Sequence, residues 1–270
     1  MNLRSLITEP EVLRVDREDP KLIKVHGEIL ARKPMLRGVF EEFYQLCIAL
    51  DRSYFGDARG KRVELGAGVS LFKSLYPEVI VTDIKPADHL DAVVDAQAMP
   101  FRTGSIRSLY GLSFFHHLSD PESFFREALR VLTPGGGCVL LEPFHGLVAA
   151  QHYRVLHSFE GYDKSAPDWA SAARARLAMR DANQALSYIV FERDRERFSR
   201  LFPDLEIVHR KPLRSYLRYV FSGGLNYRSL LPSFFIGPLK LLEKALTPTL
   251  SITALYQMIV LRKRAKPAPR

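Results

Sequence analysis

Residues 63–71 read VELGAGVSL and carry the clearest structural signal in the chain. A hydrophobic run leads directly into a glycine turn, and a segment suited to a helix follows. Glycines at such a turn let the backbone bend tightly and approach a ligand closely. A dinucleotide-binding turn needs a third glycine where Leu71 stands, and it rarely has an acidic residue such as Glu64 at the strand end. The turn therefore favours a nucleoside ligand without phosphates.

Short β-branched runs alternate with helical segments on both sides of this turn. We expect strands at 62–65, 79–82, 92–94, 106–112 and 138–141. An amphipathic helix is predicted over 121–132, with Asp120 as its N-cap and Pro134 and three glycines ending it. Later segments predict a helix at 192–202 and strands at 205–209 and 254–261. Strands alternating with helices indicate an α/β fold whose mostly parallel sheet is covered on both faces.

Acidic and polar residues follow several of the expected strands. Asp83 ends the second strand, where a carboxylate can accept hydrogen bonds from both hydroxyls of a ribose. Asp95 lies in the run VDAQAMPF at 94–101. The run LSFFHHLSDP occupies 112–121, and RVLTPGG follows at 130–136. Each carboxylate also has a plain structural interpretation, as a strand end or a turn former.

In this order and spacing the motifs resemble the class I S-adenosylmethionine-dependent methyltransferases, and among them the bacterial methyltransferase-11 type of unassigned substrate. The resemblance covers about residues 60–145 in one collinear block. It implies a Rossmann-like, seven-stranded, mostly parallel sheet with an antiparallel last strand and helices on both faces. It also implies S-adenosylmethionine as the cofactor. Ser70 departs from the family pattern, because many members have a third glycine at this position.

The resemblance further implies where the cofactor binds. The turn at 66–68 would pass under the methionine moiety, and Glu64 would hold its amino group. Asp83 would bind the ribose, Asp95 the adenine amine, and Ser113 would line the wall beside the methyl group. The full set implied in this way is Glu64, Gly66, Ala67, Gly68, Asp83, Ile84, Asp95, Ala96 and Ser113.

Three histidines are candidates for catalysis. Methyl transfer to a hydroxyl needs a base, and histidine is the usual base near neutral pH. His117 or His116, past the fourth strand, would lie where the active site of the family opens, and His145 follows the fifth strand. A histidine here can equally pack or orient the loop. Because the sequence has no His, Asp and Cys cluster with metal-ligand spacing, we expect no metal.

The domain organisation follows from where the motifs end. We expect an N-terminal helical cap at 1–60, a methyltransferase domain at 61–265 with insertions at 145–190 and 212–250, and a basic tail at 266–270. The segment 216–250 is unusually apolar and is broken by glycines and prolines. Packing on the final strands is the favoured interpretation, and a surface near anionic lipid is the other.

Composition limits the class of protein and its partners. The chain has 270 residues, a formal net charge of +9 and two cysteines, Cys47 and Cys138, which we expect in the core. It has no signal peptide and no stretch of 18 apolar residues, so the default location is the cytoplasm, with a peripheral membrane contact left open. The oligomeric state is not indicated. The expected function is methyl transfer to a small or amphipathic acceptor of lipid or glycan type.

Two alternatives stay open. The positive charge prompts an RNA-directed methyltransferase, but the chain lacks the Asn/Asp-Pro-Pro-aromatic signature of base-methylating enzymes and an appended RNA-binding module, so nucleic acid is disfavoured. A non-catalytic cofactor-binding protein is the third interpretation, against which the intact motifs argue.

Overall fold

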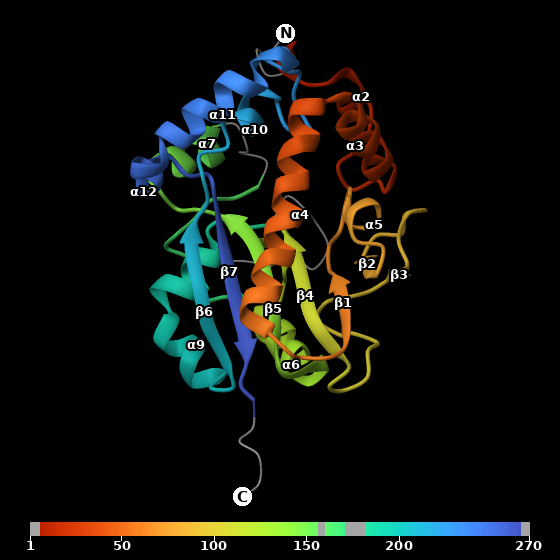
Figure 1. Cartoon of the computed structure of the whole chain (residues 1–270), viewed down its shortest axis with the longest axis vertical. Coiled ribbons are helices and arrows are strands. Elements are labelled where there is room, and N and C mark those ends of the chain that lie inside the picture. Colours follow the sequence, from red (N-terminus) through yellow and green to blue (C-terminus); the bar gives the residue numbers. More distant parts are fainter. Residues whose placement is uncertain (1–5, 156–159, 171–181, 266–270) are drawn as a thin grey trace, which may run out of the picture.

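The computed structural model describes residues 6–155, 160–170 and 182–265. Its centre is a seven-stranded sheet with the order β3-β2-β1-β4-β5-β7-β6 (Figure 1). β1 to β5 pair in parallel, and β7 pairs antiparallel with both β5 and β6. The predicted fold class is therefore confirmed. The basic residues 174, 176 and 180 and the tail 266–270 lie outside the described residues.

The elements follow one another in an alternating order after a helical start. The strands are β1 (Lys61–Glu64), β2 (Val79–Asp83), β3 (Ala92–Val93), β4 (Ile106–Leu112), β5 (Leu132–Pro143), β6 (Leu205–Pro212) and β7 (Tyr256–Lys263). The α-helices are α2 (Pro10–Leu13), α3 (Lys21–Arg32), α4 (Pro34–Phe55), α5 (Phe72–Leu75), α6 (Pro121–Val131), α7 (Leu147–Val155), α8 (Leu186–Tyr188), α9 (Arg195–Leu201), α10 (Leu217–Phe221), α11 (Ile236–Ala245) and α12 (Leu250–Thr253). Shorter 3-10 and π segments are η1 (Phe115–His117), η4 (Ile189–Arg193), η5 (Ser233–Phe235) and η6 (Thr247–Thr249).

Two hydrophobic cores lie on opposite faces of the sheet, because neighbouring strand residues point to opposite sides. Leu109 of β4 packs with α6 and α9, whereas Tyr110, the next residue, packs with α4, α5 and α7. Cys47 and Cys138 are free thiols, one in each core, as expected. Because α4 covers one face of the sheet, residues 34–55 belong to the core of the sheet and not to a separate N-terminal cap.

Several boundaries differ from those expected. α6 begins at Pro121 with Asp120 accepting the amide of Ser123 at 3.0 Å, as predicted, but it ends at Val131 and β5 starts at the next residue. The glycines after Pro134 thus lie in a strand. Gly137 must be glycine there, because a Cβ would approach the carbonyl oxygen of Leu261 on β7 to 2.0 Å.

The helix expected at 192–202 is divided into two segments. η4 is a π-helix, and α9 begins two residues later. The wider turn packs Phe191 against Phe115 and Phe198, with ring centroids 5.1 and 5.6 Å apart. The last strand starts at Tyr256 and not at 254, since α12 occupies the preceding residues up to Thr253.

The parallel strands point toward the end of the molecule where α2, α3, α7 and α10 to α12 gather (Figure 1). Lys33 joins two of these segments. Its buried ammonium donates to the carbonyl of Gly224 at 3.0 Å and lies 2.9 Å from the Glu9 carboxylate. No described helix is long and apolar enough to cross a membrane. The carboxyl edge of the sheet is therefore enclosed by helices from both ends of the described chain.

Candidate functional site

The glycine turn lies at the carboxyl end of β1, between β2 and β4, where the strand order reverses direction. Ligands of open α/β sheets bind at this switch point. Gly66 has a φ of +61°, and a Cβ there would meet the ring of Phe114 at 2.6 Å. Ala67 donates its amide to Thr82 on β2 at 3.0 Å. Around Gly68, by contrast, no heavy atom of the described residues beyond its chain neighbours lies within 4 Å of a Cβ position, so the turn is open on that side.

Glu64 is almost fully buried at the end of β1, with 1 % of its surface exposed. Ser70 donates its hydroxyl to Oε2, and among the described residues Oε1 has no hydrogen-bond partner. Burial raises the pKa of this carboxyl to about 8, with a further contribution from Asp83. A buried oxygen that lacks a donor is costly unless a ligand supplies one. An ammonium group, such as that of the methionine moiety, would satisfy it.

Asp83 ends β2 beside this turn. Its Oδ2 accepts the amide of Gly68 at 2.9 Å, and its Oδ1 accepts the amide of Lys85 at 2.9 Å. The side chain therefore shapes the turn, as its structural interpretation required. Each carboxylate oxygen has two lone pairs, so a ribose hydroxyl could still be accepted. Ile84 is exposed next to it, where an adenine ring could lie.

Asp95 and Ser113 border the same edge. Asp95 closes a turn by accepting the amide of Gln97 at 2.8 Å, and Ala96 beside it is buried. Ser113 is exposed and has a φ of +52°, a strained conformation for a residue other than glycine. Its amide donates to Leu141 on β5 at 2.7 Å, which fixes the turn at the end of β4. The structure thus places all the predicted cofactor residues along one edge.

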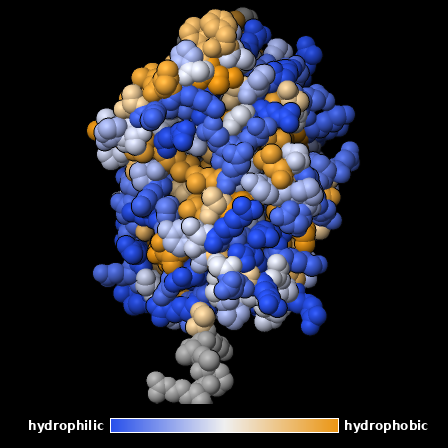
Figure 2. Space-filling model, viewed as in Figure 1, coloured by the Kyte–Doolittle hydropathy of each residue, from blue (hydrophilic) through white to orange (hydrophobic). Residues whose placement is uncertain are grey.

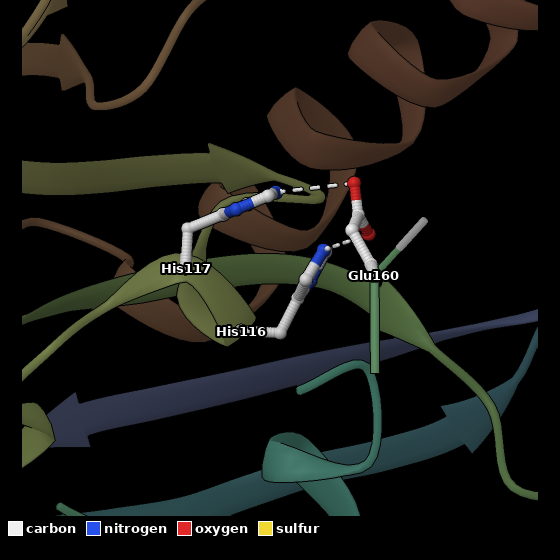
Figure 3. A group of neighbouring side chains, drawn as sticks. All are labelled: His116, His117 and Glu160. Carbon is white, nitrogen blue, oxygen red and sulfur yellow. Dashed lines mark ion pairs between the residues drawn. The ribbon is translucent and has the colours of Figure 1, made fainter. Parts of the chain in front are cut away.

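His116 and His117 follow Ser113 in η1, and each faces Glu160 (Figure 3). Nδ1 of His116 lies 2.7 Å from Oε2 of Glu142, and its Nε2 lies 3.4 Å from Oε2 of Glu160. Nε2 of His117 lies 3.9 Å from Oε1 of Glu160. These side chains come from η1, β5 and the segment after α7, so the chain converges on one point.

The two histidines differ in their electrostatics. Burial disfavours the charged imidazolium of His116, but Glu142 and Glu160 outweigh it and raise its pKa to about 10. Burial, together with the charge of His116, lowers the pKa of His117. A base needs an open nitrogen, and both ring nitrogens of His116 already face carboxylates. His117 is therefore the better placed of the two to meet an acceptor.

His145 lies apart from this group. Its Nε2 pairs with Glu192 at 3.1 Å, and its ring packs on Tyr188 with centroids 4.9 Å apart. Glu192 also pairs with Arg210. None of the described contacts of His145 joins it to His116 or His117, and its catalytic role stays a prediction.

Two residues of the site were missed by sequence reasoning. Glu142 could have been found, because it is the last residue but one of β5 at the carboxyl edge, where Glu64 and Asp83 end their own strands. Its Oε1 accepts the amides of Phe114 and Phe115 at 2.9 and 2.7 Å, so it also shapes the turn after β4. Glu160 follows α7 in a segment without a motif, and only the fold brings it to the histidines.

Comparison with known proteins gives one family match. Residues 64–140 match a family model described as a methyltransferase domain, Methyltransf_11. The match contains the glycine turn, Asp83, Asp95, Ser113 and both histidines of η1. A search of curated proteins finds no match.

Several solved structures are similar to this chain at low identity. Geranyl diphosphate C-methyltransferase from Streptomyces coelicolor A3(2) has 16% identity and a TM-score of 0.49, over 95% of this chain and 89% of that one. Phosphoethanolamine N-methyltransferase 2 from Haemonchus contortus has 12% identity and a TM-score of 0.46, over 95% and 60%. A putative sarcosine dimethylglycine methyltransferase from Galdieria sulphuraria has 16% identity and a TM-score of 0.43, over 84% and 86%.

The matched residues and the architecture around them agree with each other. The matched segment contains the turn after β1 with its unsatisfied buried carboxylate, the acidic end of β2 and the strained turn after β4. It is enclosed in a sheet of the expected order with an antiparallel β7. Residues 64–140 are therefore similar to the Methyltransf_11 methyltransferase domain, which supports the S-adenosylmethionine-dependent methyl transfer expected from the sequence.

Proposed function

We propose that the enzyme methylates a small amphipathic acceptor, whose reactive group lies beside His117 and whose apolar part lies under α10. The bound cofactor supplies a methyl group on a positively charged sulfur. An acceptor oxygen, nitrogen or carbon would bond to the methyl carbon in line, and the sulfur would leave as a neutral thioether with the electrons of the broken carbon–sulfur bond. Positioning the two reactants contributes most of the rate of such a reaction. The residues of the chain would therefore act mainly by placing the acceptor.

At the cofactor end, Glu64 would accept the ammonium group of the methionine moiety and Asp83 the ribose hydroxyls. Asp95, with Ala96, would lie at the adenine, and Ser113 beside the methyl group. At the acceptor end, a hydroxyl acceptor would lose its proton to His117. These roles are proposals supported by the burial of Glu64 and by the placement of the others along one edge.

The observation that carries the acceptor class is a small apolar cavity of about 70 Å³ next to α10, which has room for a short apolar end of an acceptor and not for a whole one. Its lining includes Ile7, Tyr219, Val220, Leu225 and Leu230. Burial raises the pKa of the Tyr219 hydroxyl, and the negative charge of Glu160 raises it further. An apolar cavity with a polar group at one end suits a ligand with the same division.

The outer surface at the end of the molecule where α7, α10 and α11 lie is apolar as well. Phe234 is 77 % exposed, Leu241 73 % and Leu147 of α7 73 %. In Figure 2 hydrophobic residues gather over this end of the molecule. The segment 230–253 has one acidic residue, Glu243, which is buried, whereas Lys240 and Lys244 are exposed. An apolar patch with Lys240 and Lys244 beside it suits an anionic lipid surface, and we propose that the acceptor is reached from there.

The acceptor class can be tested by methyl transfer from labelled cofactor into fractionated extracts. Label should enter the lipid or lipid-linked glycan fraction. Transfer into RNA alone would overturn the proposal and favour the RNA-directed alternative. Binding of cofactor with no transfer into any fraction would favour a non-catalytic protein.

The surface can be tested separately by sedimentation with liposomes. The protein should sediment with anionic liposomes at low salt, less so at moderate salt, and little with neutral ones. The double variant Phe234→Ser, Leu241→Ser should stay in the supernatant while binding S-adenosylhomocysteine normally. Leu201→Ser, on α9 at the far end of the molecule, is a matched control for an exposed leucine. Sedimentation unaffected by the double variant would exclude this surface.

A further inference from the structure

We propose that His116, His117 and Glu160 bind a divalent transition-metal ion, and that Glu142 orients His116 from behind. One nitrogen from each histidine and one carboxylate oxygen lie within 4.8 Å of one another. Figure 3 shows the two imidazoles and the carboxylate converging from η1 and from the segment after α7. The sequence did not predict this group, because Glu160 lies more than 40 positions after the histidines.

The distances are those of ligands around a shared ion. Ligands about 2.1 Å from a tetrahedral ion lie about 3.4 Å from one another. Nε2 of His116 is 3.4 Å from Oε2 of Glu160, and Nε2 of His117 is 3.9 Å from Oε1. Small side-chain rotations would therefore bring the three ligand atoms within bonding distance of one ion.

Glu142 is an independent observation that points to a metal. A metal-binding histidine almost always donates its other ring nitrogen to a carboxylate or a carbonyl, which fixes the ring and its tautomer. Nδ1 of His116 has such a partner, the fully buried Glu142, at 2.7 Å. Since Oε1 of Glu142 already accepts two backbone amides, its Oε2 is held in place to receive this bond. Nε2 of His116 is then directed at Glu160.

Charge also matches a divalent ion. Among the described residues, the ion pairs of Glu142 include His116 and no lysine or arginine. When the ion binds in place of a proton on His116, its two positive charges balance the negative charges of Glu142 and Glu160.

The donor set indicates which ions fit. Two imidazole nitrogens and one carboxylate suit zinc and its first-row neighbours, whereas magnesium and calcium prefer oxygen ligands throughout. Three protein ligands leave a position open, as in catalytic zinc sites. His117 keeps 27 % of its side chain exposed, so this position would be reachable. With the ion bound, His117 would be a ligand in place of a base, and the ion would lower the pKa of a hydroxyl held at the open position, so that its proton passes to water. This role of the ion rests on the proposed function, whereas the binding of the ion does not.

Metal binding can be measured without any acceptor. Protein stripped with a chelator is titrated with Zn²⁺ and with Co²⁺, by calorimetry and by the visible absorption of bound Co²⁺, with Mg²⁺ for comparison. We expect one equivalent of Zn²⁺ or Co²⁺ per chain and no comparable binding of Mg²⁺. His117→Ala and Glu160→Gln should weaken binding at least about 100-fold, and Glu142→Gln about 10–100-fold.

His209→Gln is the matched control, because His209 lies on β6 and its Nδ1 bonds the hydroxyl of Tyr54 on α4, outside the group. It should leave stoichiometry and affinity unchanged. S-adenosylhomocysteine binding reports that each variant is folded. Absence of stoichiometric Zn²⁺ or Co²⁺ binding in the parent protein would overturn the inference and leave a buried ion-pair group, whatever the acceptor screen finds. Binding that His117→Ala and Glu160→Gln both leave unchanged would equally overturn it.

Discussion

Nη2 of Arg218 in α10 lies 2.9 Å from Oε2 of Glu243 in α11, and both side chains are buried. The same guanidinium donates to both carboxylate oxygens of Glu42 in α4, at 2.9 and 2.8 Å. Burial opposes the charge on Arg218, yet the two carboxylates prevail and raise its pKa. One arginine thus joins the apolar segment to a helix of the central core.

Removing this arginine should destabilise the protein strongly. Arg218→Met leaves Glu243 buried without its cation, and loss of one partner of a buried pair costs about 3–5 kcal/mol. Denaturant unfolding measures the loss. Arg214→Met is the control, since Arg214 is half-exposed and lies 3.8 Å from Glu42. Its cost should stay below about 1 kcal/mol. Equal effects of the two substitutions would mean that the buried triad contributes nothing special.

Glu64 should affect cofactor binding and stability in opposite directions as the pH changes. Its pKa in the folded protein is about 8, above the ordinary 4.5, so its favourable contribution to folding is complete below pH 4.5 and is lost as the pH rises to about 8. The charged form, however, is the one that accepts an ammonium. Affinity for S-adenosylhomocysteine should therefore increase from pH 6.5 to 8.5.

Glu64→Gln separates the two effects. It should raise the melting temperature relative to the parent protein at pH 8.5, lower cofactor affinity there, and remove the rise in affinity with pH. Calorimetry and thermal unfolding at both pH values provide the measurements. If the variant keeps the parent's pH dependence of binding, Glu64 is not the group that meets the ammonium.

Asp83 should matter for cofactor affinity more than a neighbouring aspartate does. Charge-assisted hydrogen bonds to ribose hydroxyls contribute about 1.5–3 kcal/mol each, so Asp83→Ala should weaken binding about tenfold or more. Asp91 is the control, because it also accepts a backbone amide, that of Val81 at 2.8 Å. A dissociation constant that is unchanged in Asp83→Ala would leave this residue only its role in the turn.

His117 should affect turnover and hardly affect cofactor binding. We expect His117→Gln to lower turnover of an identified acceptor about 10²–10⁴-fold while the affinity for S-adenosylhomocysteine stays within a few-fold. His209→Gln again serves as the control. Turnover close to that of the parent would show that positioning by the rest of the site suffices without this imidazole.

The central sheet could be predicted from sequence because its signals are local. The strand expected at 106–112 is β4 with the same limits, and Asp120 caps α6 as its position before Pro121 predicts. The glycines after Pro134 were expected to form a turn, but they lie in β5. Glycine is favoured both in a turn and in a strand whose neighbour approaches closely. Only the backbone of Leu261, far along the chain, decides between them.

The acceptor side could not be predicted in the same way, because its contacts are long-range. Glu160 lies beside the histidines only because the chain after α7 returns to η1. No sequence motif predicts this contact. Arg218 and Glu243 lie in a largely apolar segment, and they form a buried ion pair that the composition of the segment does not predict. From the sequence alone, charged residues in such a segment are expected to face the solvent.

The place of β7 has a consequence for the order in which the chain can fold. β6 is an edge strand whose ladder runs along β7 alone, and β7 separates it from β5. During synthesis β6 leaves the ribosome before its partner exists. The half-sheet from β1 to β5 can assemble as the chain emerges, but β6 must wait for residues 256–263. Until then Leu140 and its neighbours on β5 form an open sheet edge. In this state the chain is most able to bind a chaperone or to pair with a second nascent chain.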